Sequence, residues 1–418
     1  MSHQFKHICV IGLGYIGLPT AATFAAHGVK VTGVDVNPYA VDMINQGKVH
    51  IVEPDLDALV RDVVAQQKLS AQLTPTAADA YIVAVPTPFK EDHEPDLKYI
   101  EIAAKALAPF LTKGNLVILE STSPVGATEQ MAAWLSEARP DLTFPQQADE
   151  QADILVAHCP ERVLPGKVLQ ELISNDRIVG GMTTRCSTAA CALYKVFVKG
   201  ECITTNERTA EMCKLTENSF RDVNIAFANE LSIICDKLDI NVWELVSLAN
   251  RHPRVKILQP GPGVGGHCIA VDPWFIVAKT PEQARLIRTA REVNDAKPEW
   301  VIGQVKIKIA DFLKDNPDKT IKDVKIACYG LAFKPDIDDL RESPALEITK
   351  KLAEQGLKIL AIEPNITELP EKLPSNVILI PLEDRNQADI HLILVDHKEF
   401  KSNVKFDTGY LVDTKGLI

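Results

Sequence analysis

Cys268 lies at the end of a glycine-rich stretch that gives a substrate room to reach a thiol. Residues 261–268 read GPGVGGHC, and Asp272 follows four residues after the cysteine. Glycines let a substrate carbon come close, and the start of a helix favours the thiolate. A thiolate adds to an aldehyde, and the adduct can lose hydride to become a thioester that water cleaves. With a hydride acceptor bound, the stretch therefore predicts oxidation to an acid.

Three polar residues share one face of a long expected helix over 207–238. Lys214, Asn218 and Arg221 are spaced four and three residues apart, which places them on one side of an α-helix. A lysine, an amide and an arginine in one stripe suit an anionic ligand rich in hydroxyl groups. The alternative is a solvated polar face, which is the commoner outcome for such a stripe.

A glycine loop near the N-terminus predicts a dinucleotide site. Gly12, Gly14 and Gly17 lie between an expected strand and an expected helix. The first permits a tight turn, the second lets the backbone approach a pyrophosphate, and the third lets the helix pack closely. Asp35 ends the next strand, where a carboxylate binds ribose hydroxyls and repels a 2′-phosphate. The flanking strand and helix favour a dinucleotide site over a glycine turn without a ligand. Asp35 favours NAD over NADP as the dinucleotide.

Alternating strands and helices fill the first 200 residues. Nearly continuous apolar runs indicate strands buried on both faces, which is typical of a parallel sheet. The expected strands are 7–12, 29–35, 80–86, 114–120 and 153–159. The strand signal then nearly disappears, and helices are expected over 207–238, 241–250 and 282–313, the last interrupted by Pro298. We interpret these helices mainly as a structural scaffold or a dimer interface.

Strands return near the C-terminus. The expected elements are strands at 324–333, 357–364, 388–397 and 410–416 and a helix at 343–356. The first loop has no glycine triplet but carries Lys334 and Arg341, which suit an anionic ligand at the carboxyl end of a strand. Salt bridges to the aspartates at 336, 338 and 339 are an equally good explanation.

The chain thus predicts an α/β protein with two Rossmann-like, doubly wound α/β domains joined by a central all-helical domain. The expected boundaries are 1–205, 206–314 and 315–418.

Composition excludes several classes of protein. The net charge of −11 disfavours a nucleic-acid or anionic-membrane partner, and it is compatible with a local basic pocket for a small anion. The nine cysteines show no spacing typical of a zinc site, so no metal is expected, and they fit a reducing cytoplasm. No apolar run is long enough to span a bilayer.

Taken together, the motifs resemble the UDP-glucose/GDP-mannose dehydrogenase family over essentially the whole chain. The motifs are VIGLGYIGLP (10–19), VAVPTPF (83–89), STSPVG (121–126), CPERVLPG (159–166), EMCKLTENSFRDVNIAFANE (211–230), NRHPRV (250–255), GPGVGGHCIAVDPWF (261–275) and GLAFKPDIDDLRESPA (330–345). With His267 before the cysteine, the chain resembles the branch of the family that acts on N-acetylhexosamines. The UDP-glucose and GDP-mannose branches usually carry serine at this position.

The resemblance implies that the C6 alcohol of a nucleotide sugar becomes a carboxylate while two NAD⁺ are reduced. The substrate implied is UDP-N-acetyl-D-mannosamine, for a cell-surface polysaccharide such as enterobacterial common antigen. Cys268 would hold the thiohemiacetal and thioester, Lys214 would exchange protons, and Asn218 would donate to the oxyanion. Asp272 would assist proton handling. Two further residues match positions thought to place the hydrolytic water: Glu161 and Thr122.

The resemblance also implies the binding residues. Those matching NAD contacts, besides the three glycines, are Tyr15, Ile16, Asp35, Thr87 and Thr128. Those matching substrate contacts, besides Lys214 and Asn218, are Arg162, Val163, Arg221, His252, Arg254, Gly265, Lys334, Arg341 and Lys415. The family further implies a homodimer built on the central helices, in which Arg254 is the candidate to reach the partner's active site.

Three alternatives remain open at this point. UDP-N-acetylglucosamine differs from the favoured substrate only at C2, which the motifs do not settle. A two-electron NAD-dependent hydroxyacid dehydrogenase would use the lysine and the amide without a nucleophilic cysteine. A non-catalytic protein would bind NAD or the nucleotide sugar without turnover.

Overall fold

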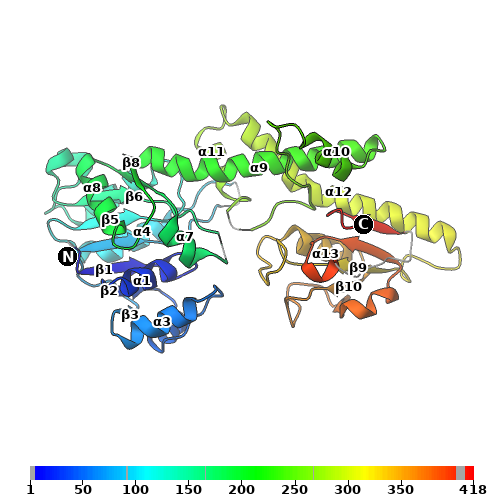
Figure 1. Ribbon diagram of the computed structural model, residues 1–418, viewed down its shortest axis with the longest axis horizontal. Coiled ribbons are helices and arrows are strands. Elements are labelled where there is room, and N and C mark those ends of the chain that lie inside the picture. The colour runs from blue at the N-terminus through cyan, green and yellow to red at the C-terminus, as the bar shows by residue number, and fades with distance from the viewer. Residues whose placement is uncertain (1–4, 91–92, 165, 267, 402–409) are drawn as a thin grey trace. The chain divides into compact units, whose positions relative to one another are not determined.

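A computed structural model describes residues 5–90, 93–164, 166–266, 268–401 and 410–418 (Figure 1). The chain divides into two compact units, Met1–Glu217 and Asn218–Ile418. The boundary lies within the long helix α9 (Glu207–Lys237). Each unit has its own β-sheet, and the fold confirms the expected α/β class with Rossmann-like sheets and a helical region between them in sequence.

The first unit contains an eight-stranded sheet in the order β3-β2-β1-β4-β5-β6-β7-β8. All neighbouring strands are parallel except β6 and β7. The order reverses direction between β1 and β4, which is where doubly wound sheets bind ligands at the carboxyl ends of their strands. The strands are β1 (His7–Ile11), β2 (Lys30–Val34), β3 (Leu69–Gln72), β4 (Ala80–Val83), β5 (Leu116–Leu119), β6 (Leu155–His158), β7 (Arg177–Gly181) and β8 (Cys202–Asn206).

Helices cover both faces of this sheet. One core cluster joins the strands to α1, α3 and α8, and a second joins them to α4 and α5. Burial on both faces explains why the central strands are apolar without interruption. The helices of this unit before α9 are α1 (Gly17–Ala26), α2 (Pro38–Asn45), α3 (Leu56–Ala65), α4 (Lys98–Leu107), α5 (Ala127–Ala138), α6 (Pro145–Ala148), α7 (Val168–Ser174) and α8 (Thr184–Tyr194).

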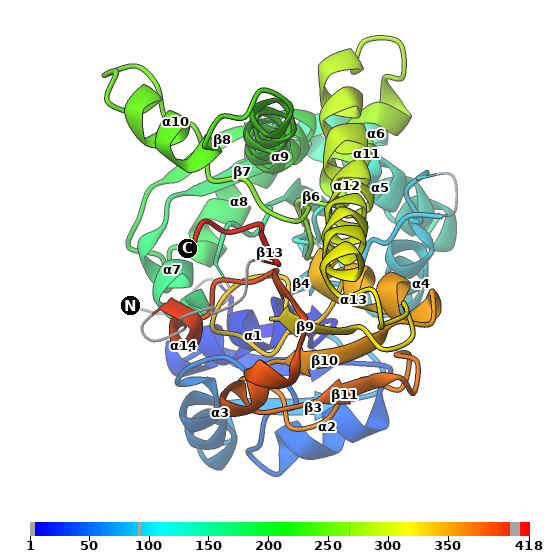
Figure 2. The same cartoon turned by 90° about the vertical axis from the view of Figure 1, so that its right-hand side faces the viewer.

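The second unit contains a five-stranded, fully parallel sheet in the order β11-β10-β9-β12-β13. Helices α12 and α13 pack on one face of it (Figure 2), and a smaller cluster that includes Phe400 covers the other. Its elements after α9 are α10 (Val242–Ala249), α11 (Asp272–Lys279), α12 (Arg285–Asp315), β9 (Lys325–Tyr329), α13 (Pro344–Glu354), β10 (Lys358–Ile362), β11 (Val377–Leu379), β12 (Ile390–Ile393), α14 (Lys398–Lys401) and β13 (Leu411–Asp413).

The expected interruption at Pro298 is wrong, because α12 is one helix of 31 residues that runs through the proline. A proline removes one helical hydrogen bond, and in an isolated helix it would end or kink the segment. Here Val301, Ile302 and Val305 follow it immediately and are fully buried in the core of the second sheet. Packing of this apolar stripe stabilises the helix across the proline.

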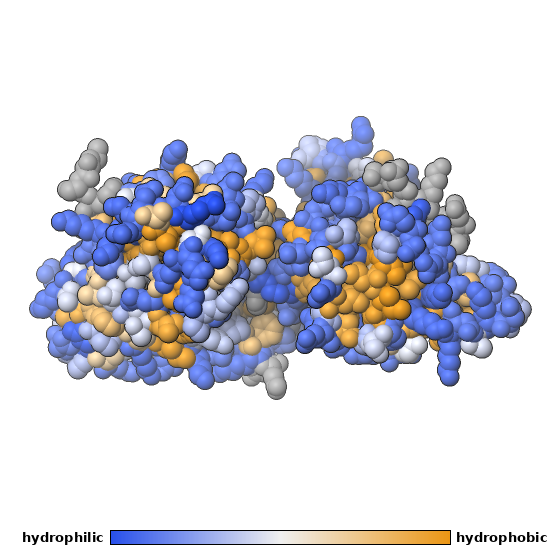
Figure 3. Space-filling model, turned by 90° about the horizontal axis from the view of Figure 1, so that it is seen from below, coloured by the Kyte–Doolittle hydropathy of each residue, from blue (hydrophilic) through white to orange (hydrophobic). Residues whose placement is uncertain are grey.

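On the face shown in Figure 3, hydrophilic residues surround one broad group of hydrophobic residues on the right-hand part and smaller groups on the left. Within the part of the chain that the structure describes, no helix combines the length and the apolarity that crossing a bilayer requires.

Candidate functional site

The glycine loop of the first unit has the shape that a pyrophosphate requires. Gly12 has φ +92°, and a Cβ placed there would lie 2.5 Å from the carbonyl oxygen of Ala84. A Cβ at Gly17 would lie 1.8 Å from the oxygen of Gly12, so α1 can begin this close only at a glycine. A Cβ at Gly14 would meet nothing within 4 Å, which leaves its backbone open to a ligand. The loop therefore fits a dinucleotide.

Asp35 follows β2 and supports this loop directly. Its Oδ2 accepts a hydrogen bond from the backbone N–H of Leu13 at 2.9 Å, and its Oδ1 accepts one from Asn37 N–H at 2.9 Å. Each oxygen keeps a second lone pair that a ribose hydroxyl can use. Nearby on the loop, Tyr15 is exposed and Ile16 is half-buried.

Replacing Asp35 with alanine is expected to lower the preference for NAD over NADP by about tenfold in kcat/KM, because the repulsion of a 2′-phosphate disappears. The same change removes the acceptor for Leu13 N–H, so the KM for NAD should also rise. Asp35→Asn is the matched control, since its amide oxygen can still accept from Leu13. Unchanged discrimination in both variants would remove Asp35 from cofactor selection.

The two threonines expected at the cofactor, Thr87 and Thr128, and the one expected at the hydrolytic water, Thr122, have different surroundings. The hydroxyl of Thr87 donates to the carbonyl oxygen of Thr122, which joins the loops after β4 and β5. Thr128 is fully buried, and its hydroxyl donates to the carboxylate of Glu211 at 2.7 Å. The hydroxyl proton of Thr128 is therefore used within the protein.

Glu211 is a residue that the sequence analysis missed. This fully buried carboxylate accepts from Gly126 N–H at 2.7 Å and from Thr128 N–H at 2.8 Å, at the start of α5. Burial raises the pKa of Glu211, while these hydrogen bonds act in the opposite direction. Because Glu211 lies one turn before Lys214 on α9, it fixes the backbone of the half-buried lysine against the loop 121–126. The i, i+3 spacing to Lys214 was the available signal.

Glu161 lies in a buried ionic cluster after β6. Its Oε2 pairs with Nη2 of Arg177 at 2.8 Å, and its Oε1 accepts from Arg162 N–H at 2.7 Å. The guanidinium of Arg162 pairs with Glu217 at 2.7 Å. Val163 beside it is half-buried.

In the second unit, backbone and side-chain bonds connect three of the expected catalytic residues. The carbonyl of Cys268 accepts from Asp272 N–H at 2.9 Å, which closes the turn that leads into α11. The Oδ2 of Asp272, which is 3% exposed, accepts from Nδ2 of Asn218 at 2.5 Å. The amide of Asn218 has a second N–H that remains available for an oxyanion. Cys268 itself is exposed, as a nucleophile must be, and so is Arg221 on α9.

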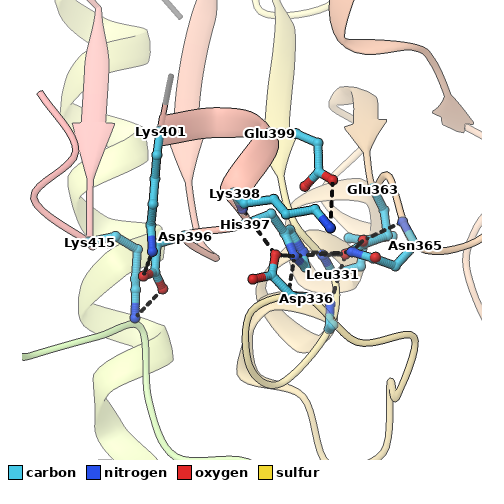
Figure 4. Close-up of polar contacts among 11 residues, drawn as sticks. Leu331, Asp336, Glu363, Asn365, Asp396, His397, Lys398, Glu399, Lys401 and Lys415 are labelled. Atoms are coloured by element: carbon cyan, nitrogen blue, oxygen red, sulfur yellow. Dashed lines mark hydrogen bonds and ion pairs between the residues drawn. The ribbon is translucent and has the colours of Figure 1, made fainter. Parts of the chain in front are cut away.

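A pocket of about 170 Å³ in the second unit brings together two of the expected substrate lysines, Lys334 and Lys415. Backbone from Gly261 to Gly263 forms another wall. The Nζ of Lys415 pairs with Asp396 at 3.2 Å, and Asp396 also pairs with Lys401 at 2.9 Å (Figure 4). A basic, glycine-lined pocket of this kind suits a phosphate-containing ligand.

The remaining expected substrate residues do not line this pocket in the described part of the chain. Arg341 makes a two-pronged ion pair with Asp339 at 2.9 and 2.6 Å, so the salt-bridge alternative holds for this arginine. His252 and Arg254 are exposed after α10. Gly265 packs tightly, because a Cβ there would lie 2.4 Å from the carbonyl oxygen of Glu342.

A cluster beside the pocket has the composition of a metal site. One ligand atom from each of Asp336, His397 and Glu399 lies within 4.8 Å of the others (Figure 4). However, Nδ1 of the buried His397 lies 2.9 Å from Asp336 N–H and Nε2 lies 3.0 Å from Glu363, so both ring nitrogens are occupied. Burial would raise the pKa of Glu363, but hydrogen bonds from His397 and Leu331 N–H lower it to about 2. We interpret the cluster as a support for the loop after β9.

The chain is similar to known proteins along its whole length. Family models of the UDP-glucose/GDP-mannose dehydrogenases match at residues 6–198 (NAD binding domain), 208–296 (central domain) and 327–418 (UDP binding domain). The UDP-N-acetyl-D-mannosamine dehydrogenase of Yersinia pestis is 64% identical over 421 residues, covering 99% of both chains. The NDP-N-acetyl-D-galactosaminuronic acid dehydrogenase of Ralstonia solanacearum is 61% identical over 420 residues, covering 99% of this chain and 96% of its own.

A solved structure agrees with these relatives. The UDP-N-acetyl-mannosamine dehydrogenase of Staphylococcus aureus superposes with a TM-score of 0.85 at 43% identity, covering 99% of this chain and 95% of its own. His267, used above to choose a branch of the family, lies outside the described residues. Identity at this level over the full chain, together with the NAD-shaped glycine loop, shows that the chain is an NAD-dependent enzyme that belongs to the UDP-glucose/GDP-mannose dehydrogenase family.

Proposed function

We propose that this enzyme oxidises the C6 alcohol of UDP-N-acetyl-D-mannosamine to the carboxylate, with two NAD⁺ reduced in each turnover. The name of the Yersinia pestis relative supports the manno sugar. The Ralstonia solanacearum relative, named for a galacto sugar, makes an N-acetylgalactosamine nucleotide the second candidate. We further propose that the product supplies a cell-surface polysaccharide of the enterobacterial common antigen type.

The observation that carries this proposal is the connection from Cys268 to Asp272 and from Asp272 to Asn218. The backbone carbonyl of the exposed Cys268 accepts from the backbone N–H of Asp272 at 2.9 Å, and the buried carboxylate of Asp272 accepts from the amide of Asn218 at 2.5 Å. A two-electron alcohol dehydrogenase has no use for such a thiol. Covalent capture of an aldehyde does, because the thiolate holds the intermediate for a second oxidation.

The residues act in the following order in this proposal. Lys214 accepts the proton of the C6 hydroxyl in the first oxidation, for which bound NAD⁺ would supply the hydride acceptor. The Cys268 thiolate then bonds to C6 of the aldehyde, and the free N–H of Asn218 together with the Lys214 ammonium stabilises the oxyanion. Loss of a second hydride leaves a thioester on Cys268, and water cleaves it to the carboxylate and regenerates the thiolate.

Glu161 and Thr122 are proposed to place the hydrolytic water. Both follow neighbouring parallel strands, β6 and β5, at their carboxyl ends. That edge of the sheet is also where the glycine loop lies, next to β1. The Glu161 carboxylate keeps lone pairs beyond its bonds to Arg177 and Arg162, and these can orient a water molecule.

The experiment that tests the proposal counts NADH formed for each sugar consumed. UDP-N-acetylmannosamine is compared with UDP-N-acetylglucosamine, UDP-N-acetylgalactosamine and UDP-glucose. We expect about two NADH per sugar on the manno substrate alone, as the thioester route requires. One NADH per sugar would remove Cys268 from the mechanism, and preference for the galacto substrate would correct the sugar.

Replacing Lys415 with glutamine is expected to raise the KM for the nucleotide sugar about tenfold with little change in kcat, because a charge-assisted bond to phosphate is lost. Lys401→Gln is the matched control, since Lys401 pairs with the same Asp396 but does not line the pocket. Equal KM values in the two variants would show that Lys415 serves only its ion pair.

We also propose a homodimer built on α9. Three apolar side chains spaced seven residues apart along this helix, and a fourth directly after its end, remain 44–67% exposed: Phe220, Phe227, Ile234 and Leu238. A helix face of this kind requires a partner, and the exposed Arg254 is the candidate to complete the other subunit's site. A monomer in sedimentation at micromolar concentration would contradict the dimer.

The three-part division at 1–205, 206–314 and 315–418 remains our proposal for the functional domains. It places NAD in the first part and UDP in the last, in agreement with the order of the family models. The cytoplasm, where NAD and nucleotide sugars are available to a cysteine enzyme, is the proposed location.

A further inference from the structure

The first unit contains a buried ionic cluster whose charges do not balance. Arg177 is 4% exposed and lies between two carboxylates, Glu120 at 3.2 Å and Glu161 at 2.8 Å. Glu120 is 1% exposed, and Tyr194 OH donates to its Oε1 at 3.0 Å. One guanidinium thus faces two buried acids. Because an uncompensated buried charge is costly, one of the two acids must hold a proton over part of the pH range.

Strand direction explains how the cluster arises. Glu120 directly follows β5, and Glu161 comes shortly after the neighbouring β6. The strand β7 is antiparallel to β6, so its first residue, Arg177, lies at the edge where β6 ends. A parallel β7 would carry the guanidinium to the opposite edge. The antiparallel pairing of β7 with β6 therefore places the guanidinium of Arg177 beside the carboxylate of Glu161.

Glu120 is the member of the pair that takes up the proton. Burial raises the pKa of Glu120 to about 7, against the lowering effect of Arg177, and the charge of Glu161 adds to the rise. The other groups that face Glu120 are Tyr194, Thr20 and Cys159; burial keeps the tyrosine and the thiol neutral by raising their pKa values. Glu161, in contrast, is fixed through both oxygens by Arg177 and by Arg162 N–H.

We propose that Arg177 and Glu120 are positioning residues for Glu161, and that the proton on Glu120 sets how much of the Arg177 charge Glu161 receives. When Glu120 is protonated, Arg177 pairs with Glu161 alone. When Glu120 is ionised, the two carboxylates share one guanidinium, so less positive charge opposes the transfer of a proton from the attacking water toward Glu161. Hydrolysis of the thioester should then be faster on the alkaline side of neutrality. This inference rests on the proposed role of Glu161 in placing the water.

The test measures the hydrolysis step alone across pH. In single-turnover mixing with UDP-N-acetylmannosamine and NAD⁺, mass spectrometry follows the decay of the acylated Cys268. For the parent enzyme we expect the decay rate to rise about tenfold between about pH 6 and about pH 8. Glu120→Gln, which keeps the shape and fixes the neutral form, should show the slow acidic rate throughout.

Tyr194→Phe provides a second variant whose effect has the same direction as that of Glu120→Gln but is partial. Its loss removes a hydrogen bond that favours ionised Glu120, so the inflection should move to higher pH rather than disappear. A merely structural role for Glu120 would change the rates without altering the shape of the profile. An unchanged inflection in Glu120→Gln would overturn the proposal.

A readout independent of turnover separates this inference from the proposed function. Infrared difference spectra of the enzyme alone should show a carboxylic acid that titrates near neutrality in the parent and is missing in Glu120→Gln. If no nucleotide sugar yields NADH but this band titrates, the assigned reaction fails and the proton on Glu120 stands. If turnover is normal and no such band titrates, the inference fails.

Discussion

Cys268→Ser is expected to reduce multiple turnover by roughly 10³-fold or more, because a serine hydroxyl is a poor nucleophile at neutral pH and its ester hydrolyses slowly. The substitution leaves the backbone bond from the residue 268 carbonyl to Asp272 N–H in place. Binding of NAD and of the sugar should therefore stay within a few-fold of the parent values, and at most one slow round of oxidation should be seen.

The measurement is NADH formed per active site, in a pre-steady-state burst and in steady state. Cys202→Ser is a suitable control, since Cys202 is half-exposed on β8 and has no role in the proposed reaction. Parent-like turnover in Cys268→Ser would exclude the thioester route and favour a reaction without covalent capture.

Much of the fold follows from hydrophobic pattern alone. The five strands expected in the first domain are all present and mutually parallel. The strands that the pattern missed are short or polar, such as β3 with LSAQ and β8 with CITTN. Edge strands bury little of their surface and need not be apolar, so their sequences do not differ from those of loops.

Backbone constraints made the cofactor loop the most predictable part of the site. The spacing of its three glycines already implied why each must be glycine. A Cβ at Gly17 would lie 1.8 Å from the oxygen of Gly12, and the space beside Gly14 is open for a ligand. The pairing of Asn218 with Asp272, in contrast, links residues 54 positions apart. No local period encodes such a contact, so the sequence predicted both residues but not the bond between them.

The buried residues Arg177 and Glu211 could not be predicted from the sequence for a related reason. In the sequence Arg177 looks like an ordinary charged residue, and charged residues are usually exposed. Its burial depends on the antiparallel direction of β7, which hydrophobic pattern does not reveal. The role of Glu211 likewise depends on α5. Its carboxylate accepts from N–H groups at the start of that helix, and Thr128, one of these donors, is 83 positions away in the sequence.

Lys214→Ala is expected to lower kcat by about 10² to 10⁴-fold while the KM for NAD changes little, because the lysine exchanges the C6 proton and stabilises the oxyanion. Glu211, one turn earlier on α9, holds this part of the helix through bonds of 2.7 and 2.8 Å that the substitution does not touch. The loss should thus reflect chemistry rather than a displaced helix.

Two comparisons make the Lys214 result decisive. Lys237→Ala, at the exposed end of the same helix, removes a lysine of equal helix propensity and should leave kcat unchanged. A fall in kcat matched by an equal rise in the KM for NAD would instead mean that Lys214 holds the cofactor, and the acid–base role would pass to another group. Retention of the parent kcat at every pH would exclude Lys214 from proton transfer altogether. The variant lacks the ammonium group, and the substitution adds no other group that could exchange the proton.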